Sequence, residues 1–125
     1  MTGGADPMSV LDSTQLILQR AISGATLRGT VLADNLANAD TPGFQPSDVD
    51  FHAALQGAID GGPGAIGRVS FSPEQGPPLA LRADGNGVDP EAESAKLAEN
   101  GLELNALVEV AGARVQIMRT AMGVS

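Results

Sequence analysis

The sequence contains no cysteine, no tryptophan and no tyrosine, and its aromatic residues are three phenylalanines among 125 residues. The absence of cysteine excludes disulfide bonds and thiolate metal sites. Because each aromatic side chain buries about 150–250 Å², a chain with so few of them builds a thick globular core poorly. Its apolar residues, 42% of the total, are mostly Ala, Leu, Val and Ile, which suits packed helices better.

Positive charge is also scarce, with seven Lys and Arg against 15 Asp and Glu and a formal net charge of −8. A nucleic-acid interface needs a basic surface, so a nucleic-acid binder is excluded. Binding to anionic lipid is disfavoured for the same reason. Residues 1–14 have neither the basic start nor the apolar centre of a secretory signal peptide. No apolar run approaches the roughly 18–20 residues of a membrane span. If the protein leaves the cytoplasm, we expect another export route.

Residues 12–38 have the pattern of an amphipathic helix. Asp12 is a candidate N-cap, and Gln15 three residues later can complete a capping box. Apolar and small residues recur at alternating spacings of four and three, which is a heptad pattern. They are Leu18, Ile22, Ala25, Gly29, Leu32 and Leu36. Because the residue before a proline is driven out of the α region, Thr41 and Pro42 end the helix.

Residues 89–122 predict a second long helix. Asp89 is the expected N-cap and Pro90 the first helical residue, while Arg114 and Arg119 near the far end suit the helix dipole. The heptad stripe consists of Leu97, Gly101, Leu104, Val108, Ala111, Val115, Met118 and Met122. A second stripe beside it consists of Leu107, Val110, Ile117 and Ala121. Because this apolar arc is too wide for one partner helix to cover, we expect neighbouring molecules to cover the remainder.

The region between these helices is rich in residues that interrupt helices, with eight Gly and five Pro in residues 57–90. We expect a flexible loop over residues 61–88, in which 68–71 and 79–82 can pair as a short hairpin. Ahead of it, residues 39–60 form a motif loop and a short helix, which a Ser47–Asp50 capping box opens. The face of that short helix carries Phe51, Leu55 and Ile59.

These patterns predict one mainly α domain over residues 1–125. The long terminal helices, 12–38 and 89–122, are expected to pack as an antiparallel coiled-coil pair. A short helix and a Gly/Pro-rich loop with little or no β structure join them. A buried apolar side chain contributes about 1.5–3 kcal/mol, whereas ordering the backbone costs about 1–2 kcal/mol per residue. We therefore expect a marginal single chain that folds on assembly, with a monomeric helical hairpin as the alternative.

Residues 35–44 read locally as a helix end. Asn38 can terminate the helix in the left-handed conformation, Gly43 permits a positive φ, and Phe44 can fold back on Leu36. Asn35 and Asn38 are three residues apart, so they share a helix face and can satisfy backbone groups of the loop or of a neighbour. By local chemistry alone, an ordinary helix cap is the favoured interpretation.

The residues of this helix end also carry a resemblance. Ala-Asp-Asn-Leu-Ala-Asn at 33–38 and Thr-Pro-Gly-Phe at 41–44 resemble the N-terminal signature of bacterial flagellar rod and hook proteins. Within that group, three further segments resemble the FlgB family of proximal rod proteins: 48–51, 84–89 and 91–100. The resemblance covers both ends of the chain and leaves out residues 57–81.

The resemblance implies a structural protein and not an enzyme, with no cofactor, metal or small-molecule substrate. Such proteins leave the cytoplasm unfolded through the flagellar type III apparatus, without a cleaved signal. They polymerise through their terminal helices into the periplasmic rod, which transmits torque and encloses the export channel. The implied partners are copies of the chain, the rod proteins FlgC, FlgF and FlgG, the adaptor FliE and the export gate. The implied contact residues are Asn35, Leu36, Asn38, Thr41, Pro42, Gly43, Phe44, Leu97, Leu104, Val108, Ala111, Val115 and Met118.

Other interpretations of the sequence remain. The chain resembles FlgC-like short rod proteins less closely, and a soluble helical adaptor or export chaperone would have a self-contained paired fold. Asp48 and His52 are four residues apart and suit a metal, but a solvated helix face is the favoured reading. Residues 84–87 with Glu93 echo part of a calcium loop, although a turn before a helix fits them better.

Overall fold

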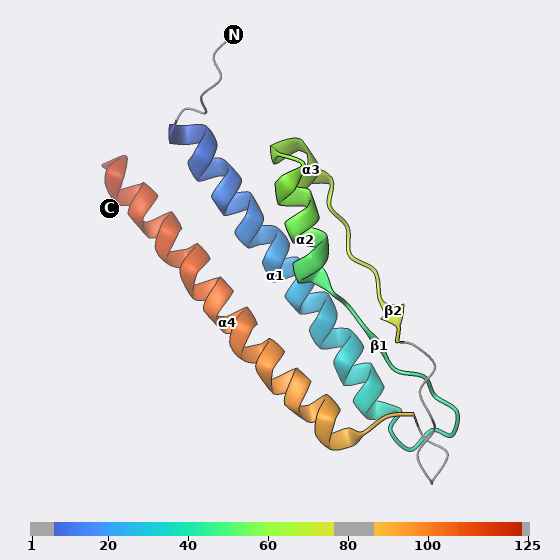
Figure 1. The fold of residues 1–125 in the computed structure, drawn as a ribbon. Helices are drawn as coiled ribbons and strands as arrows, with labels where there is room; N and C mark the ends of the chain where they lie inside the picture. The colour runs from blue at the N-terminus through green and yellow to red at the C-terminus, as the bar shows by residue number, and fades with distance from the viewer. Residues whose placement is uncertain (1–6, 77–86, 124–125) are drawn as a thin grey trace.

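The computed structural model describes residues 7–76 and 87–123 and is mainly helical. Helix α1 and helix α4 lie side by side and run in opposite directions, while the shorter α2 and α3 lie on another side of α1 (Figure 1). Two two-residue strands, β1 and β2, form an antiparallel pair. The elements are α1 Pro7–Ala37, β1 Ser47–Asp48, α2 Phe51–Asp60, α3 Pro63–Arg68, β2 Glu74–Gln75 and α4 Pro90–Ala121.

Helix α1 begins five residues earlier than predicted. Pro7 opens it, since the fixed φ of proline suits a first helical position, and Asp12 lies inside the helix, so the predicted Asp12 cap is wrong. All six residues of the predicted heptad stripe are buried or half-buried. At the other end, Asn38 does not adopt the predicted left-handed conformation, because only glycines have positive φ among the described residues. The reversal occurs at Gly43 instead, with φ +78°.

Helix α4 begins as its sequence predicts. The Asp89 side chain accepts a hydrogen bond from the Glu91 N–H at 3.1 Å, and Pro90 is the first helical residue. Glu91 and Glu93 in the first turn and Arg119 in the last agree with the helix dipole. The cap and the end charges are local features, which explains why the sequence alone located this helix.

Helix α2 is present, but its start differs from the prediction. Ser47 belongs to β1, and the cap is Asp50, whose carboxylate accepts from the Ala53 N–H at 3.1 Å. Phe51 and Leu55 are buried and Ile59 is 38% exposed. The predicted capping box is therefore wrong, because pairing of β1 with β2 holds Ser47 in an extended conformation.

Helix α3 lies within residues 61–88, which were predicted to form a flexible loop. Gly62 adopts φ +92° ahead of it, Pro63 opens it, and Ile66 is 3% exposed and anchors it. Six residues are too few to show a helical period, which is why the pattern missed this helix. The predicted hairpin partner at 79–82 lies outside the described residues, and the strand that follows α3 pairs with β1.

The core lies beside the middle of α1, where α2 packs against it. Ala21 and Ala25 of α1 contact Val49, Phe51 and Leu55, and half-buried side chains from α4 and the 69–71 segment complete the cluster. The rings of Phe51 and Phe71 meet edge to face with centroids 6.3 Å apart. Two of the three phenylalanines thus supply the aromatic packing of a core otherwise built from small aliphatic side chains.

Candidate functional site

The inner face of α4, which meets α1, differs in part from the predicted stripe. Leu97, Leu104, Ala111 and Met118 are half-buried, as expected for that stripe. Val108 and Met122 are 52% and 69% exposed, and Val115 is also exposed. The inner face is instead completed by Asn100, Leu107 and Arg114, each one residue earlier. With Gly101, which is also half-buried, five of the eight residues of the predicted stripe are half-buried and three are exposed.

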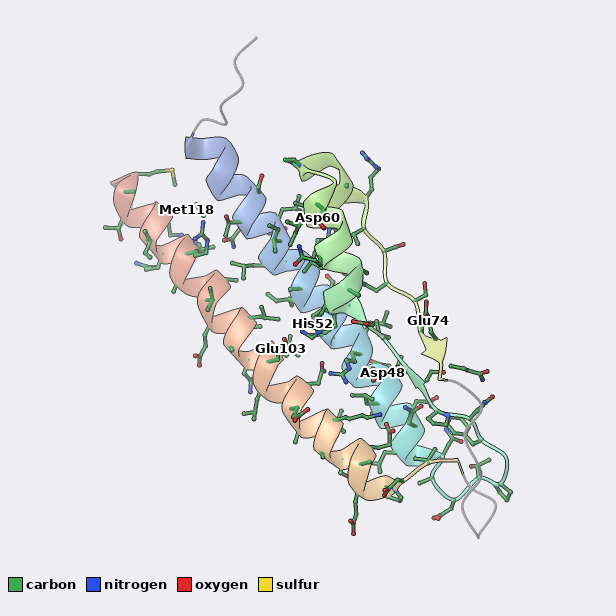
Figure 2. The ribbon with its side chains drawn as sticks, in the orientation of Figure 1. Asp48, His52, Asp60, Glu74, Glu103 and Met118 are labelled. Carbon is green, nitrogen blue, oxygen red and sulfur yellow. The ribbon has the colours of Figure 1, made fainter. Side chains whose placement is uncertain are left out.

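A second set of apolar side chains, on α4 and its C-cap residue, has no cover from the part of the chain that the structure describes. We call this set the outer α4 surface. Its members are Leu102, Val108, Val110, Val115, Ile117 and Met122, all of them exposed. Val110 and Ile117 belong to the predicted second stripe, whereas Leu107 of that stripe packs against the core. Figure 2 shows the side chains of α4 standing away from the other helices along much of its length. Val108, Val115 and Met122 follow one another at heptad spacing, and so do Val110 and Ile117, so the surface consists of two exposed apolar strips and Leu102. Exposed apolar strips of this kind mark interaction sites.

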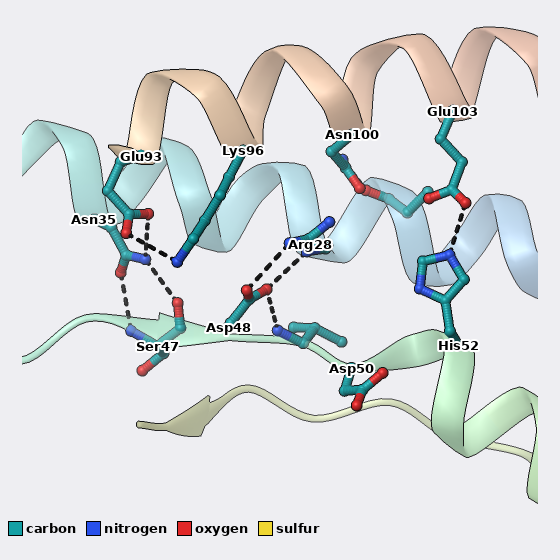
Figure 3. A network of polar contacts seen from close by, with 12 residues as sticks. Arg28, Asn35, Ser47, Asp48, Asp50, His52, Glu93, Lys96, Asn100 and Glu103 are labelled. Atoms are coloured by element: carbon teal, nitrogen blue, oxygen red, sulfur yellow. Dashed lines mark hydrogen bonds and ion pairs between the residues drawn. The ribbon is translucent and has the colours of Figure 1, made fainter. Parts of the chain in front are cut away.

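Asn35 is 2% exposed and joins three elements (Figure 3). Its Nδ2 donates to the Ser47 carbonyl at 2.6 Å and to Glu93 Oε2 at 3.0 Å, and its Oδ1 accepts from the Ser47 N–H at 3.1 Å. Since Asn35 and Glu93 come from α1 and α4, the amide holds β1 against both long helices. Asn35 was predicted to be a partner contact, and its described hydrogen bonds are all internal.

The turn after α1 is exposed at the end of the helix pair. Asn38 Nδ2 donates to the Asp34 carbonyl at 2.9 Å, and Thr41 Oγ1 donates to Asn38 Oδ1 at 3.2 Å. Thr41, Pro42 and Gly43 are exposed, while Leu36 and Phe44 are half-buried. Within the signature, Asn35 therefore serves the interior and residues 41–43 face outward.

An ion pair that the sequence analysis missed links α1 to β1. Arg28 Nε and Asp48 Oδ1 are 2.8 Å apart, and Arg28 Nη2 reaches Oδ2 at 3.2 Å. Partial burial alone would raise the pKa of Asp48, but hydrogen bonds from Arg28 and the Val49 N–H and the charges of Arg28 and Lys96 hold it below its usual value. The same hydrogen bond, opposed by burial, raises the pKa of Arg28.

His52 and Asp48, the residues considered for a metal, point to different partners. His52 Nε2 lies 2.6 Å from Glu103 Oε2 on α4, and Asp48 is bound by Arg28 (Figure 3). Within residues 7–76 and 87–123, no group of three His, Asp or Glu side chains is arranged to hold a metal ion. The same residues include no helix long and apolar enough to cross a membrane. Residues 84–86 of the considered calcium loop lie outside the described residues.

Two buried polar residues of α4 were also missed as interior groups. Asn100 Nδ2 donates to the Ala25 carbonyl at 2.8 Å, and Glu93 accepts from Asn35. They are one heptad apart, so their spacing indicates a shared helix face. An analysis that considers only apolar residues misses this signal.

Comparisons with known proteins agree with one another. The family described as "Flagella basal body rod protein" matches residues 17–45. FlgB of Yersinia enterocolitica, a flagellar basal body rod protein, is 31% identical over 90% of this chain and 95% of its own. The same protein of Proteus mirabilis (strain HI4320) is 33% identical over 86% and 92%, and that of Escherichia coli (strain K12) is 34% identical over 74% and 80%.

Proposed function

The chain belongs to the flagellar basal body rod protein family, and we propose that it polymerises through its two long helices into the proximal rod. It is a structural subunit of the flagellar basal body and not an enzyme, and it serves motility. The relatives that match this chain over most of their own length are named FlgB. This favours the proximal rod over an FlgC-like position, a helical adaptor or an export chaperone.

In this proposal α1 and α4 form an antiparallel coiled-coil pair that acts as a single rod domain. Support comes from the heptad stripe of α1, which is buried or half-buried throughout, and from the half-buried Leu97, Leu104, Ala111 and Met118 that face it. A pair with one covered face and one exposed apolar face behaves as a folded building block whose remaining surface is free for other subunits.

The outer α4 surface is the observation that carries the assembly proposal. Ile117 is 66% exposed and Met122 is 69% exposed, although both are large apolar side chains on a long helix. Burying each such side chain against a neighbour contributes about 1.5–3 kcal/mol at full coverage. We therefore assign the predicted contacts Val108 and Val115 to the interface between subunits, and Leu97, Leu104, Ala111 and Met118 chiefly to the pair itself.

The exposed turn after α1 supplies a second contact in this proposal. Thr41, Pro42 and Gly43 face outward at the end of the helix pair. Gly43 has φ +78°, a conformation that fixes the turn and that other residues adopt only with strain. A rigid exposed turn loses little entropy when it docks, so it suits contact with a neighbouring rod subunit. Asn38 and Phe44 are hydrogen-bonded to Thr41 and hold the turn, and the half-buried Leu36 precedes it in α1.

The proposed partners are further copies of the chain, the rod proteins FlgC, FlgF and FlgG, the adaptor FliE and the export gate. The proposed location is the periplasmic rod, reached through the flagellar type III apparatus, where the assembly transmits torque and encloses the export channel. Support for these details is the family membership together with the resemblance of the residues around 33–51 and 84–100.

Substitutions on α4 test this proposal. Val108→Asp and Ile117→Asp each place a charge in the proposed interface and are expected to abolish rod assembly and swimming. Because both residues are exposed in the single chain, the helical content of the purified variants should match the parent. Ser94→Asp is the matched control, since Ser94 is an exposed polar residue of the same helix and lies outside the outer α4 surface, and it should leave swimming intact. Normal swimming by a strain carrying Ile117→Asp would rule the interface out.

A further inference from the structure

The buried residues of α4 are polar. Glu93 is 4% exposed and Asn100 is 2% exposed, whereas the apolar residues of the helix are all half-buried or exposed. The two are seven residues apart, so they occupy equivalent heptad positions on the inner face. The interior of the α1–α4 contact therefore contains polar groups where a helix pair built for stability alone would contain leucine.

Both polar groups have specific partners on α1, and Figure 3 shows the contact between Glu93 and Asn35. Asn100 Nδ2 donates to the Ala25 carbonyl at 2.8 Å. Gly29 gives this amide its room, since a Cβ on Gly29 would lie 3.2 Å from Nδ2. Glu93 Oε2 accepts from Asn35 Nδ2 at 3.0 Å. Asn100 Oδ1 accepts no hydrogen bond from the described residues, so only the Nδ2 group of this side-chain amide is hydrogen-bonded among them.

The apolar pattern by itself does not determine how α4 is placed along α1. The stripes on both helices repeat every seven residues, so a shift of one heptad, about 10 Å along the axis, leaves apolar residues facing apolar residues. The polar groups distinguish the alternatives. In one direction Glu93 would replace Asn100 opposite Ala25, so a carboxylate would face the Ala25 carbonyl in place of the amide donor, and Glu93 would lose Asn35. In the other direction Leu107 would take that place, and the Ala25 carbonyl would lose its amide.

We propose that Asn100 and Glu93 are register-determining residues that fix the axial position of α4 on α1. One buried polar residue is known to select a helix-pair register at a cost in stability, and the unpaired Oδ1 of Asn100 is consistent with such a cost. The register determines the position of the outer α4 surface along the helix axis, relative to the exposed turn at 41–43. The inference concerns the single chain, so it does not depend on the proposed assembly.

A distance measurement on the full chain tests the proposal. Spin labels on Thr30→Cys and Gln116→Cys report the axial offset, because both positions are exposed, lie on different helices and are well separated along the pair. The chain has no native cysteine, so labelling is specific. The parent should give one narrow distance. Glu93→Leu/Asn100→Leu should keep its helical content and show a second population displaced by about 10 Å, one heptad.

Leu104→Ala is the matched control. It removes an apolar contact of the same inner face, so it should lower the unfolding midpoint while keeping the single distance. A single unchanged distance in the double leucine variant would overturn the proposal. Loss of helical content in that variant would overturn it as well, since it would show that the polar pair supplies stability and does not choose between registers.

Discussion

Gly24 of α1 lies directly against Phe51 of α2. A Cβ built on Gly24 would stand 2.6 Å from the Phe51 Cβ and 2.7 Å from its Cγ, far inside van der Waals contact. Phe51 is 1% exposed and belongs to the core. A glycine inside a helix costs about 1 kcal/mol relative to alanine, and here that cost allows the largest side chain of the core to pack on the α1 backbone.

Gly24→Ala is therefore expected to destabilise the fold in spite of its better helix propensity. Overpacking of a filled core costs about 1–3 kcal/mol, which exceeds the gain of about 1 kcal/mol in propensity. Chemical denaturation followed by circular dichroism measures the difference. Gly112→Ala in α4 is the control, because nothing lies within 4 Å of its added Cβ, and it should raise stability. A Gly24→Ala variant as stable as Gly112→Ala would contradict the packing described.

The two asparagines of the signature should behave differently when changed to alanine. Asn35→Ala removes three hydrogen bonds from a buried site, two of them to the Ser47 backbone and one to Glu93. A buried polar group left unsatisfied costs about 1–3 kcal/mol. Asn38→Ala loses half-buried local contacts, and its effect should stay within about 0.5 kcal/mol. Thermal melts of the two variants provide the comparison, and equal shifts would show that Asn35 is not the interior link.

Leu104 and Val108 belong to the same predicted stripe, yet the structure separates them. Leu104 packs against the core, so Leu104→Ala should cost about 1–3 kcal/mol of stability. Val108 is 52% exposed, so Val108→Ala should be neutral or slightly stabilising in the single chain, because alanine is the better helix former. Urea denaturation of the two variants tests the orientation of α4. The reverse order would place Val108 on the inner face.

We expect the Arg28–Asp48 ion pair to contribute to the loss of folding stability in acid. The pKa of Asp48 is lower in the folded chain than in the unfolded one, so the unfolded state binds more protons as the pH falls. The stabilisation is fully present above the unfolded pKa of about 4 and disappears as the pH falls through the folded pKa. Asp48→Asn should make the free energy of unfolding less dependent on pH below about pH 4. The number of protons taken up on unfolding should fall by a fraction of one.

The partner variant completes this test. Arg28→Gln should reduce the acid slope to a similar extent, and the double variant should show little further change, because the two groups act on one titration. Stability is measured by urea denaturation at a series of pH values between neutral and strongly acidic. An Asp48→Asn chain with the slope of the parent would mean that the pair does not contribute to the acid response.

The sequence alone located those helix ends that depend on neighbouring residues in the chain. Asp89 and Pro90 define the start of α4 through a cap and a fixed φ, and both features act within a few residues. Thr41 to Gly43 stop α1 for equally local reasons. The flagellar rod signature lies in these same local elements, which is why the family was recognisable from residues 33–44 and confirmed by whole-chain relatives.

Sequence patterns failed where the answer depended on distant partners. Helix α3 is held by the burial of Ile66 and not by a repeating pattern. Ser47 has the chemistry of a helix cap, but pairing with Gln75 and hydrogen bonds to Asn35 place it in a strand. The partners of Ser47, Asn35 and Gln75, are each more than ten positions away in the sequence.

The amino-acid sequence by itself therefore determined the helical class, the long terminal helices, the start of α4, the end of α1 and the family. The tertiary structure alone decided which side of α4 meets α1, because an apolar arc wider than one partner helix leaves several orientations open. Asn100 donates to the Ala25 carbonyl and Glu93 accepts from Asn35. In this orientation of α4, Val108 and Val115 are exposed. A periodic pattern specifies that a helix has an apolar face, but the hydrogen bonds available on its partner determine how that face is turned.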